Sequence, residues 1–266
     1  MAYARHKEFD QLHSHMEVKR DRNNRLMTIS QNKYIHDLME KFGQELIAES
    51  NISREQIAAQ PYDYRGLIGS LQPDISHAVQ RLRRHLHDPR EPHMVGAKRV
   101  LRYIKATPYV GITYQSKGTD NKATLLGCGD ASWADKPDRK STSGFVWMLL
   151  GGPVSWKSSR QKIIALSTCE AEYVAAAEAT NEMLWILHDL GQTQDTTILN
   201  CDNKAAIGTV QTASTSERSK HIEMRHCGTA DMWTDILTKI STKFAMEKFL
   251  SDVMAKMKQG DPADST

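Results

Sequence analysis

Four acidic residues in the second half of the chain have the types and the order that metal-dependent phosphodiester chemistry requires. The motifs GCGDASWAD, STCEAEYVA, ILNCDNKAA and MWTDILTK contain them as Asp130, Glu172, Asp202 and Asp235. Carboxylates brought together repel one another unless cations lie between them, so such a cluster favours Mg²⁺ or Mn²⁺. Two ions about 3.5–4 Å apart would hold the attacking water and the leaving oxygen of an in-line displacement. The sequence therefore predicts one shared hydrolytic site.

The expected secondary structure brings three of these carboxylates to one edge of a sheet. Strands are expected at 123–128, 144–150, 153–157 and 197–201. A long helix between the last two begins at a capping box of Ser167 and Glu170. A crossover of this length allows the first and fourth strands to run parallel. Asp130 and Asp202 would then meet at the carboxyl ends of neighbouring strands, with Glu172 above them.

Further helices complete the predicted second half. The long helix is expected to end before Gly191 and to bury residues that recur every three or four positions: Tyr173, Ala177, Thr180, Leu184 and Leu187. A short helix is expected at 203–209, and one or two more between 231 and 250 would carry Asp235.

Each carboxylate also has a simpler interpretation. Glu172 could be solvent-facing helix surface, Asp130 could shape a turn, and Asp202 could cap the next helix. Asp235 could be a solvated helical residue. Glu170 is excluded from the site because the capping box explains it. The prediction of a site therefore depends on the joint pattern.

The first half shows a different pattern. A hairpin with its turn at 21–24 is expected between Met16 and Ile29, and a helix from Ser30 to Gly43 follows it. The remaining predicted elements are helices at 75–86 and 93–105 and a strand at 111–114. The polar segment SKGTDN, 116–121, is the expected domain boundary.

Composition narrows the class of protein. A chain of 266 residues with 39% hydrophobic and 25% charged residues fits a globular protein of one or two domains. The net charge of +3 is small, but one stretch is basic, which fits either a phosphate-facing surface or a solvated helix face. That stretch contains Arg81, Arg83, Arg84, Lys98, Arg99, Arg102 and Lys105.

No secretory signal or membrane-length apolar run is seen, and the four cysteines lack disulfide-framework spacing. We therefore expect an intracellular protein. A zinc site at His221, His226 and Cys227 is disfavoured because it lacks a second ligand pair.

Longer stretches carry a resemblance to a known family. The run GDASWADKPDRKSTSGFVWMLLGGPVSWKSSRQKIIALSTCEAEYVAAAEA resembles the ribonuclease H domain of copia-type LTR retrotransposon polyproteins, and LNCDNKAAI, SKHIEMRH and TADMWTDILTK continue it. The first half is similar to the tail of the same polyprotein's reverse transcriptase, through MEVKRDRNNRLMTISQNKYIHDLMEKFG, YRGLIGSL, PDISHAV and AKRVLRYIKATPYVGITY. The resemblance extends to about Lys239.

The resemblance implies an α/β fold: a ribonuclease H-like mixed sheet flanked by helices, preceded by a small α+β remnant of a reverse transcriptase thumb or connection. The expected parts are a remnant at 1–115, a ribonuclease H-like domain at 122–250 and a flexible tail at 251–266. The implied activity is endonucleolytic cleavage of the RNA strand of RNA/DNA hybrids, with two Mg²⁺ (or Mn²⁺) ions held by Asp130, Glu172, Asp202 and Asp235.

The expected partners are the RNA/DNA hybrid and the rest of the Pol polyprotein, without a membrane or a small-molecule cofactor. The expected location is the cytoplasm, in a virus-like particle, or the nucleus. Two polar turns and one basic helix could contact the duplex through phosphates and 2′-hydroxyls, although ordinary polar surface would explain them too. These candidates are Arg139, Lys140, Ser141, Thr142, Lys157, Ser158, Ser159, Arg160, Lys98 and Arg102.

The chain departs from the family pattern in three places. The YVDD-type polymerase motif is missing, so no DNA synthesis is expected. Only Gln72 stands between GSL and PDISHAV, where the family has a short additional run. His226 is followed directly by Cys227, where the family has the rest of a helix and a fifth strand. Without that strand, the strand leading to Asp202 would have an exposed edge and the helix of Asp235 would lose support.

These departures keep two alternatives open, and a third is disfavoured by the order of the acidic residues. One is a catalytically inactive nucleic-acid-binding remnant of a degenerate retrotransposon copy, and another is a chain that does not fold stably. An integrase-type nuclease is disfavoured because the glutamate stands second in the order of acidic residues rather than last.

Overall fold

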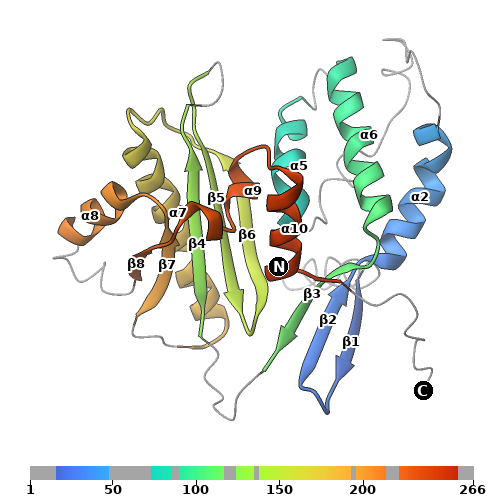
Figure 1. Ribbon diagram of the computed structural model, residues 1–266, viewed down its shortest axis with the longest axis horizontal. Coiled ribbons are helices and arrows are strands. Elements are labelled where there is room, and N and C mark those ends of the chain that lie inside the picture. The colour runs from blue at the N-terminus through green and yellow to red at the C-terminus, as the bar shows by residue number, and fades with distance from the viewer. Residues whose placement is uncertain are drawn as a thin grey trace, which may run out of the picture.

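The computed structural model describes residues 16–47, 73–85, 90–116, 124–134, 138–192, 196–213 and 222–256. In this part of the chain two sheets lie next to each other with helices packed on them (Figure 1). The gap in the family pattern after Leu71 and most of the predicted boundary at 116–121 fall outside the described residues. Among the described helices, none has the length and apolar character needed to cross a lipid bilayer.

The first sheet is antiparallel and begins with the predicted hairpin. Its strands are β1 (Glu17–Asp21), β2 (Leu26–Ser30), β3 (Val110–Gln115) and β9 (Ala255–Lys256), in the order β1-β2-β3-β9. The turn forms where it was predicted because Asp21 Oδ1 accepts hydrogen bonds from the amides of Asn23 and Asn24, both at 3.0 Å.

Three helices pack beside this sheet. They are α2 (Asn32–Ile47), α5 (Ser76–Arg83), which follows the 3₁₀ turn η1 (Pro73–Ile75), and α6 (Glu91–Ala106). Helix α2 continues past Gly43, which was expected to end it, because a glycine inside a helix costs only about 1 kcal/mol relative to alanine. The helices share a core of Ile35, Ile75, Val79, Val100 and Ile104.

The second sheet has the mixed topology that the sequence predicted. Its strands are β4 (Leu126–Ser132), β5 (Thr142–Leu149), β6 (Gly152–Arg160), β7 (Thr197–Cys201) and β8 (Ile222–His226), in the order β6-β5-β4-β7-β8. Strands β4, β5 and β6 pair antiparallel, whereas β7 runs parallel to β4 after the crossover helix α7 (Thr168–Asp189). Helix α8 (Lys204–Ala213) follows β7. The expectation of a ribonuclease H-like fold is confirmed.

Strand β8 overturns the expectation of an exposed sheet edge. It pairs in parallel with the whole of β7, from Thr197 opposite Ile222 to Cys201 opposite His226. The motif SKHIEMRH thus supplies the fifth strand that the departure after His226 was expected to remove. Consequently the strand that leads to Asp202 has a hydrogen-bonded neighbour on each side.

Helix α7 buries a different face from the one predicted. Tyr173 and Leu184 are 42% and 46% exposed, and the buried residues are Ala171, Glu172, Ala175, Ala176, Ala179 and Met183. The sheet supplies the large side chain at this interface. The Trp147 indole of β5 is fully buried and donates a hydrogen bond to the Ala179 carbonyl of α7 at 3.0 Å. Small residues on α7 therefore face the sheet, and this orientation turns Glu172 inward.

The two sheets share one hydrophobic core near the end of the chain. Helices α9 (Asp235–Thr238) and α10 (Lys243–Asp252) contribute Ile236, Leu237, Phe249 and Leu250, which pack with Val146 and Met148 of β5 and Val110 of β3. Figure 1 shows α9 and α10 between the two sheets. The described first and second halves of the chain therefore share this core, in addition to the cores that each half forms by itself.

The prediction of a flexible tail from Ser251 is wrong for its first residues. Helix α10 runs to Asp252, Val253 and Met254 are buried, and β9 pairs with β3. The sequence pattern alone did not reveal this segment because its partners lie more than a hundred residues earlier. Residues 257–266 lie outside the described part of the chain.

We predict that the aromatic residues of α10 differ sharply in their contribution to stability. Phe249 is 2% exposed and Phe244 is 76% exposed. Phe249→Ala should lower the free energy of unfolding by about 3–5 kcal/mol, because it leaves a cavity in the shared core. Phe244→Ala, the matched control, should change it by less than about 0.5 kcal/mol. Guanidinium unfolding curves measure both, and equal losses would contradict this placement of α10.

Candidate active site

Asp130 lies inside β4 rather than after it. The strand was expected to end at Cys128 but continues to Ser132, so Asp130 pairs with Gly144 of β5. Only 1% of its surface is exposed. Burial raises the pKa of Asp130, and the charges of Asp235 and Asp202 raise it further. This placement excludes a simple role in a turn.

Glu172 points from the start of α7 toward the same end of the sheet. It is 6% exposed, which excludes the interpretation as solvent-facing helix surface. Burial, followed by the charge of Asp130, raises the pKa of Glu172 to about 9. The possible ligand atoms of Glu172, Cys201 and Asp202 all lie within 4.8 Å of one another.

Asp202 follows β7 directly, and the parallel pairing of β4 with β7 brings it beside Asp130. Its Oδ2 accepts a hydrogen bond from Thr229 Oγ1 at 3.1 Å. The competing interpretation of Asp202 as a helix cap is wrong, because Asn203 Oδ1 accepts the hydrogen bond from the Ala206 amide at 3.0 Å. The carboxylate of Asp202 is therefore not used to cap the helix and can take part in the site.

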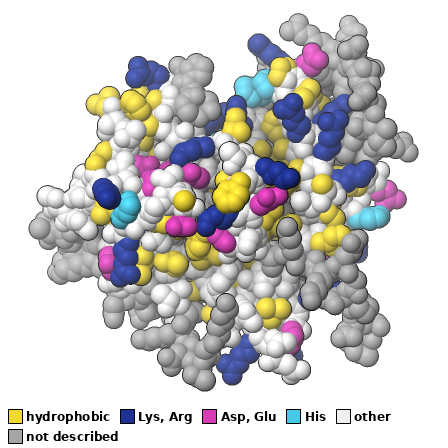
Figure 2. Space-filling model, in the orientation of Figure 1, with side chains coloured by type: hydrophobic (Ala, Val, Ile, Leu, Met, Phe, Trp, Pro, Cys, Tyr) yellow, Lys and Arg dark blue, Asp and Glu magenta, His cyan; other side chains and the backbone are white. Residues whose placement is uncertain are grey.

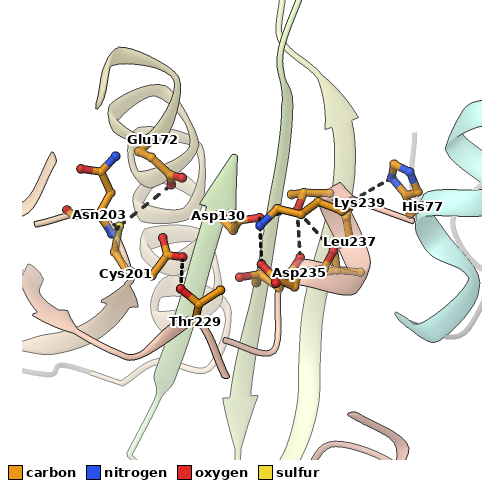
Figure 3. A network of polar contacts seen from close by, with 12 residues as sticks. His77, Asp130, Glu172, Cys201, Asn203, Thr229, Asp235, Leu237 and Lys239 are labelled. Atoms are coloured by element: carbon orange, nitrogen blue, oxygen red, sulfur yellow. Dashed lines mark hydrogen bonds and ion pairs between the residues drawn. The ribbon is translucent and has the colours of Figure 1, made fainter. Parts of the chain in front are cut away.

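Asp235 enters the site as the first residue of the single-turn helix α9. Figure 3 shows that Lys239 extends its ammonium group between the carboxylates of Asp235 and Asp130. Its Nζ lies 2.8 Å from Asp235 Oδ1 and 3.8 Å from Asp130 Oδ2. Thr238, from the same helix, donates a short hydrogen bond to Asp130 Oδ2. The four predicted carboxylates therefore converge, since the charge of Asp130 interacts with those of Glu172, Asp202 and Asp235.

Four further residues of the site were not predicted: Cys201, Thr229, Thr238 and Lys239. The motif DILTK contained a signal for Lys239, because it lies four residues after Asp235, and residues four apart on a helix are neighbours. Burial alone would lower the pKa of Lys239, but Asp130 and Asp235 outweigh it and raise the pKa, so its ammonium remains charged. Nothing local in the sequence indicated that Thr238 would reach Asp130.

The donor set fits a hard divalent cation. Four carboxylates supply oxygen ligands, which suit Mg²⁺ and Mn²⁺. The Cys201 thiol is the soft donor nearby, but burial raises its pKa to about 12 and disfavours the thiolate that binds zinc. Buried Asp130 and Glu172 also repel each other when both are ionised, and a cation between them would remove this repulsion.

The predicted duplex-binding residues are only partly available to a nucleic acid. Ser141 and Thr142 are 0% exposed, so the prediction that they contact a duplex is wrong. The reason is that β5 begins at Thr142, and Ser141 Oγ accepts a hydrogen bond from the Ala134 amide at 3.3 Å. Arg139 is exposed and Lys140 partly exposed in the adjoining turn, and their role stays a prediction.

The other candidates for duplex contact already have partners within the chain or belong to a helix away from the site. Lys157 Nζ lies 3.1 Å from Glu178 Oε2, and Arg160 pairs with Asp138. Ser158 Oγ donates a hydrogen bond to the carbonyl oxygen of Leu237 in α9, and Ser159 Oγ donates one to Glu178 Oε2 at 3.3 Å. Lys98 and Arg102 belong to α6, which packs on α2 and α5. Figure 2 shows Lys and Arg side chains over the area of α5 and α6, and acidic side chains near the centre of the view, where some Lys and Arg also lie.

Comparisons with known proteins relate the chain to mobile elements. No family model matches it. It is 32% identical over 286 residues to the retrovirus-related Pol polyprotein from transposon RE1 of Arabidopsis thaliana, which covers 93% of this chain and 19% of that protein. Against the Pol polyprotein from transposon TNT 1-94 of Nicotiana tabacum it is 32% identical over 271 residues, 91% of this chain and 20% of that protein.

Among solved structures, LC11-RNase H1 isolated from compost matches 48% of this chain and 98% of its own, with 14% identity and a TM-score of 0.34. The same enzyme in complex with an RNA/DNA hybrid matches with a TM-score of 0.36. The chain spans about a fifth of the length of the Pol polyproteins that it matches. By this homology the chain belongs with the copia-type retrovirus-related Pol polyproteins of transposons, of which it represents a segment.

Proposed function

We propose that this chain is a ribonuclease H-type endonuclease that uses two divalent cations to hydrolyse the RNA strand of an RNA/DNA hybrid. The convergence of four carboxylates from β4, α7, the end of β7 and α9 carries this proposal. Homology to Pol polyproteins supports it, because the first half of the chain resembles the tail of a reverse transcriptase, and reverse transcription of RNA produces such hybrids. The proposed partners are therefore the hybrid and the remainder of the polyprotein, in the cytoplasm or nucleus.

Asp130, Glu172, Asp202 and Asp235 would hold the cations. Bound there, two divalent ions would supply a nucleophilic water and stabilise the leaving oxygen of the phosphodiester. The residues around the carboxylates fix their orientation before any substrate arrives. Thr229 holds Asp202, and Thr238 holds Asp130. Such preorganisation lowers the reorganisation needed during the reaction.

The presence of β8 weakens the alternative of an inactive nucleic-acid-binding remnant. That alternative rested on the loss of the fifth strand and of the support for Asp235. Strand β8 pairs along the whole of β7, and α9 is packed in the shared core. The proposal therefore assigns catalysis, rather than binding alone, to this chain.

We predict that Asp130→Asn abolishes cleavage of the RNA strand. The substitution removes the negative charge of a carboxylate that would hold the cations, so the rate of cleavage should fall by about 100-fold or more. Asp189→Asn is the matched control, because the side chain of Asp189 is 75% exposed at the end of α7. An end-labelled RNA/DNA hybrid incubated with Mg²⁺, and in parallel with a chelator, measures the effect. Undiminished cleavage by Asp130→Asn, or cleavage of the DNA strand, would refute the proposal.

We predict that the metal-free chain loses stability as pH rises, and that Glu172 causes part of the loss. The folded chain raises the pKa of Glu172 from its usual 4.5 to about 9. Its stabilising contribution is therefore complete below pH 4.5 and disappears as pH increases toward 9. Glu172→Gln should remove the contribution of Glu172 to this pH dependence and be more stable than wild type at pH 8 by on the order of 2 kcal/mol.

Thermal unfolding in chelator at pH 5, 6.5 and 8 tests this prediction. Glu170→Gln, on the same turn of α7, serves as the control for the change of a glutamate to glutamine. Addition of Mg²⁺ should flatten the pH dependence of the wild-type chain. A wild-type stability that rises between pH 5 and 8 by the same amount as that of Glu172→Gln would contradict the buried position of Glu172.

A further inference from the structure

The helix that carries Asp235 cannot fix its own position. Helix α9 has four residues, and a single helical turn is unstable in isolation. Yet α9 and the residue after it supply three groups of the site: the carboxylate of Asp235, the hydroxyl of Thr238 and the ammonium of Lys239. The geometry of the site therefore depends on the elements that hold α9.

Two side chains hold α9 through one backbone carbonyl. The oxygen of Leu237 accepts a hydrogen bond from Ser158 Oγ at 2.5 Å and lies 3.2 Å from His77 Nδ1. A carbonyl can only accept, so the proton of the second bond must be on His77 Nδ1. Ser158 belongs to β6 of the second sheet, whereas His77 belongs to α5 in the first half of the chain. Figure 3 shows His77 reaching α9 from the side opposite to Glu172.

His77 is itself held by the core of the first half. It is 6% exposed, and its helix packs through Val79 against Val100 and Ile104 of α6. Directly before this helix, Asp74 accepts a hydrogen bond from the Tyr103 hydroxyl at 2.6 Å. Helix α5 also contacts β6 and α9, so His77 does not depend on the packing of Val79 alone, and its bond to Leu237 joins the first half of the chain to α9.

We propose that His77 is a positioning residue of the nuclease site, through which the first half of the chain orients Asp235, Thr238 and Lys239. The half that resembles the tail of a reverse transcriptase then has a structural role in the site: it completes the support of α9. The consequence for metal binding and cleavage rests on the proposed nuclease function, whereas the consequence for the order of α9 does not.

Three variants of the full chain separate positioning from general stability. His77→Phe keeps a ring of similar size but removes the donor. His77→Asn places an amide N–H near the position of Nδ1 and should restore the bond. Val79→Ala opens a cavity in the core of the same helix, 5% exposed in the wild type, and weakens the first half without removing a bond to α9.

Hydrogen exchange of the α9 amides gives the decisive readout in the absence of metal. The amides of Leu237 and Lys239 donate to the carbonyls of Thr234 and Asp235, both at 2.9 Å. In His77→Phe these amides should exchange roughly three- to tenfold faster, the equivalent of one lost hydrogen bond. In His77→Asn the rates should stay near wild type, and in Val79→Ala they should change no more than those of β4 and β5. Unchanged α9 exchange in His77→Phe would overturn the proposal.

Cleavage of an RNA/DNA hybrid at increasing Mg²⁺ gives a second readout. His77→Phe should raise the half-saturating Mg²⁺ concentration or lower kcat by roughly three- to tenfold, with KM for the hybrid unchanged, because α9 carries a metal ligand rather than the duplex surface. Equal losses in His77→Phe and Val79→Ala would overturn the positioning role. A wild-type chain that does not cleave would overturn the proposed nuclease function alone, and the exchange rates would still decide the role of His77.

Discussion

A carboxylate buried in the middle of a strand is the constraint on which the second half of this structure depends. Asp130 is 1% exposed, and an ionised group in such a place costs several kcal/mol unless it is paired. The elements around it provide the pairing. Gly144, opposite Asp130 on β5, has no side chain, and a Cβ there would lie 2.7 Å from the Thr238 side chain. Helix α9 can therefore lie close enough for Thr238 and Lys239 to reach Asp130.

The strands of the second sheet and the convergence of the carboxylates could be predicted because the sequence patterns that indicate them are local. The hairpin turns, the capping residue Ser167 and the strand before Asp202 are each marked by a few adjacent residues. The length of the crossover allowed the parallel pairing of β4 with β7, which the structure has. With that pairing given, Asp130 and Asp202 had to meet, whatever the side-chain details.

The errors arose where a partner distant in sequence decides the outcome. The buried face of α7 is set by Trp147 on the sheet, so the spacing of large residues such as Tyr173 and Leu184 was misleading. Met224 is the one buried residue of strand β8, so the strand has a weak hydrophobic pattern, yet β7 pairs with it throughout. The segment after Leu250 is ordered by β3, which no local rule could indicate.

The repulsion among the carboxylates is reduced in different ways on the two sides of the site. On the side of Asp202, the raised pKa of Glu172 means that a proton neutralises one carboxyl group near neutral pH. On the side of Asp235, the ammonium of Lys239 provides the positive charge. Cation binding would therefore release a proton from Glu172 on one side, and would compete with a tethered ammonium on the other. Since Lys239 is fixed to α9, whatever holds α9 also sets how closely this ammonium approaches Asp130, and this ties the electrostatics of the site to the packing between the two halves of the chain.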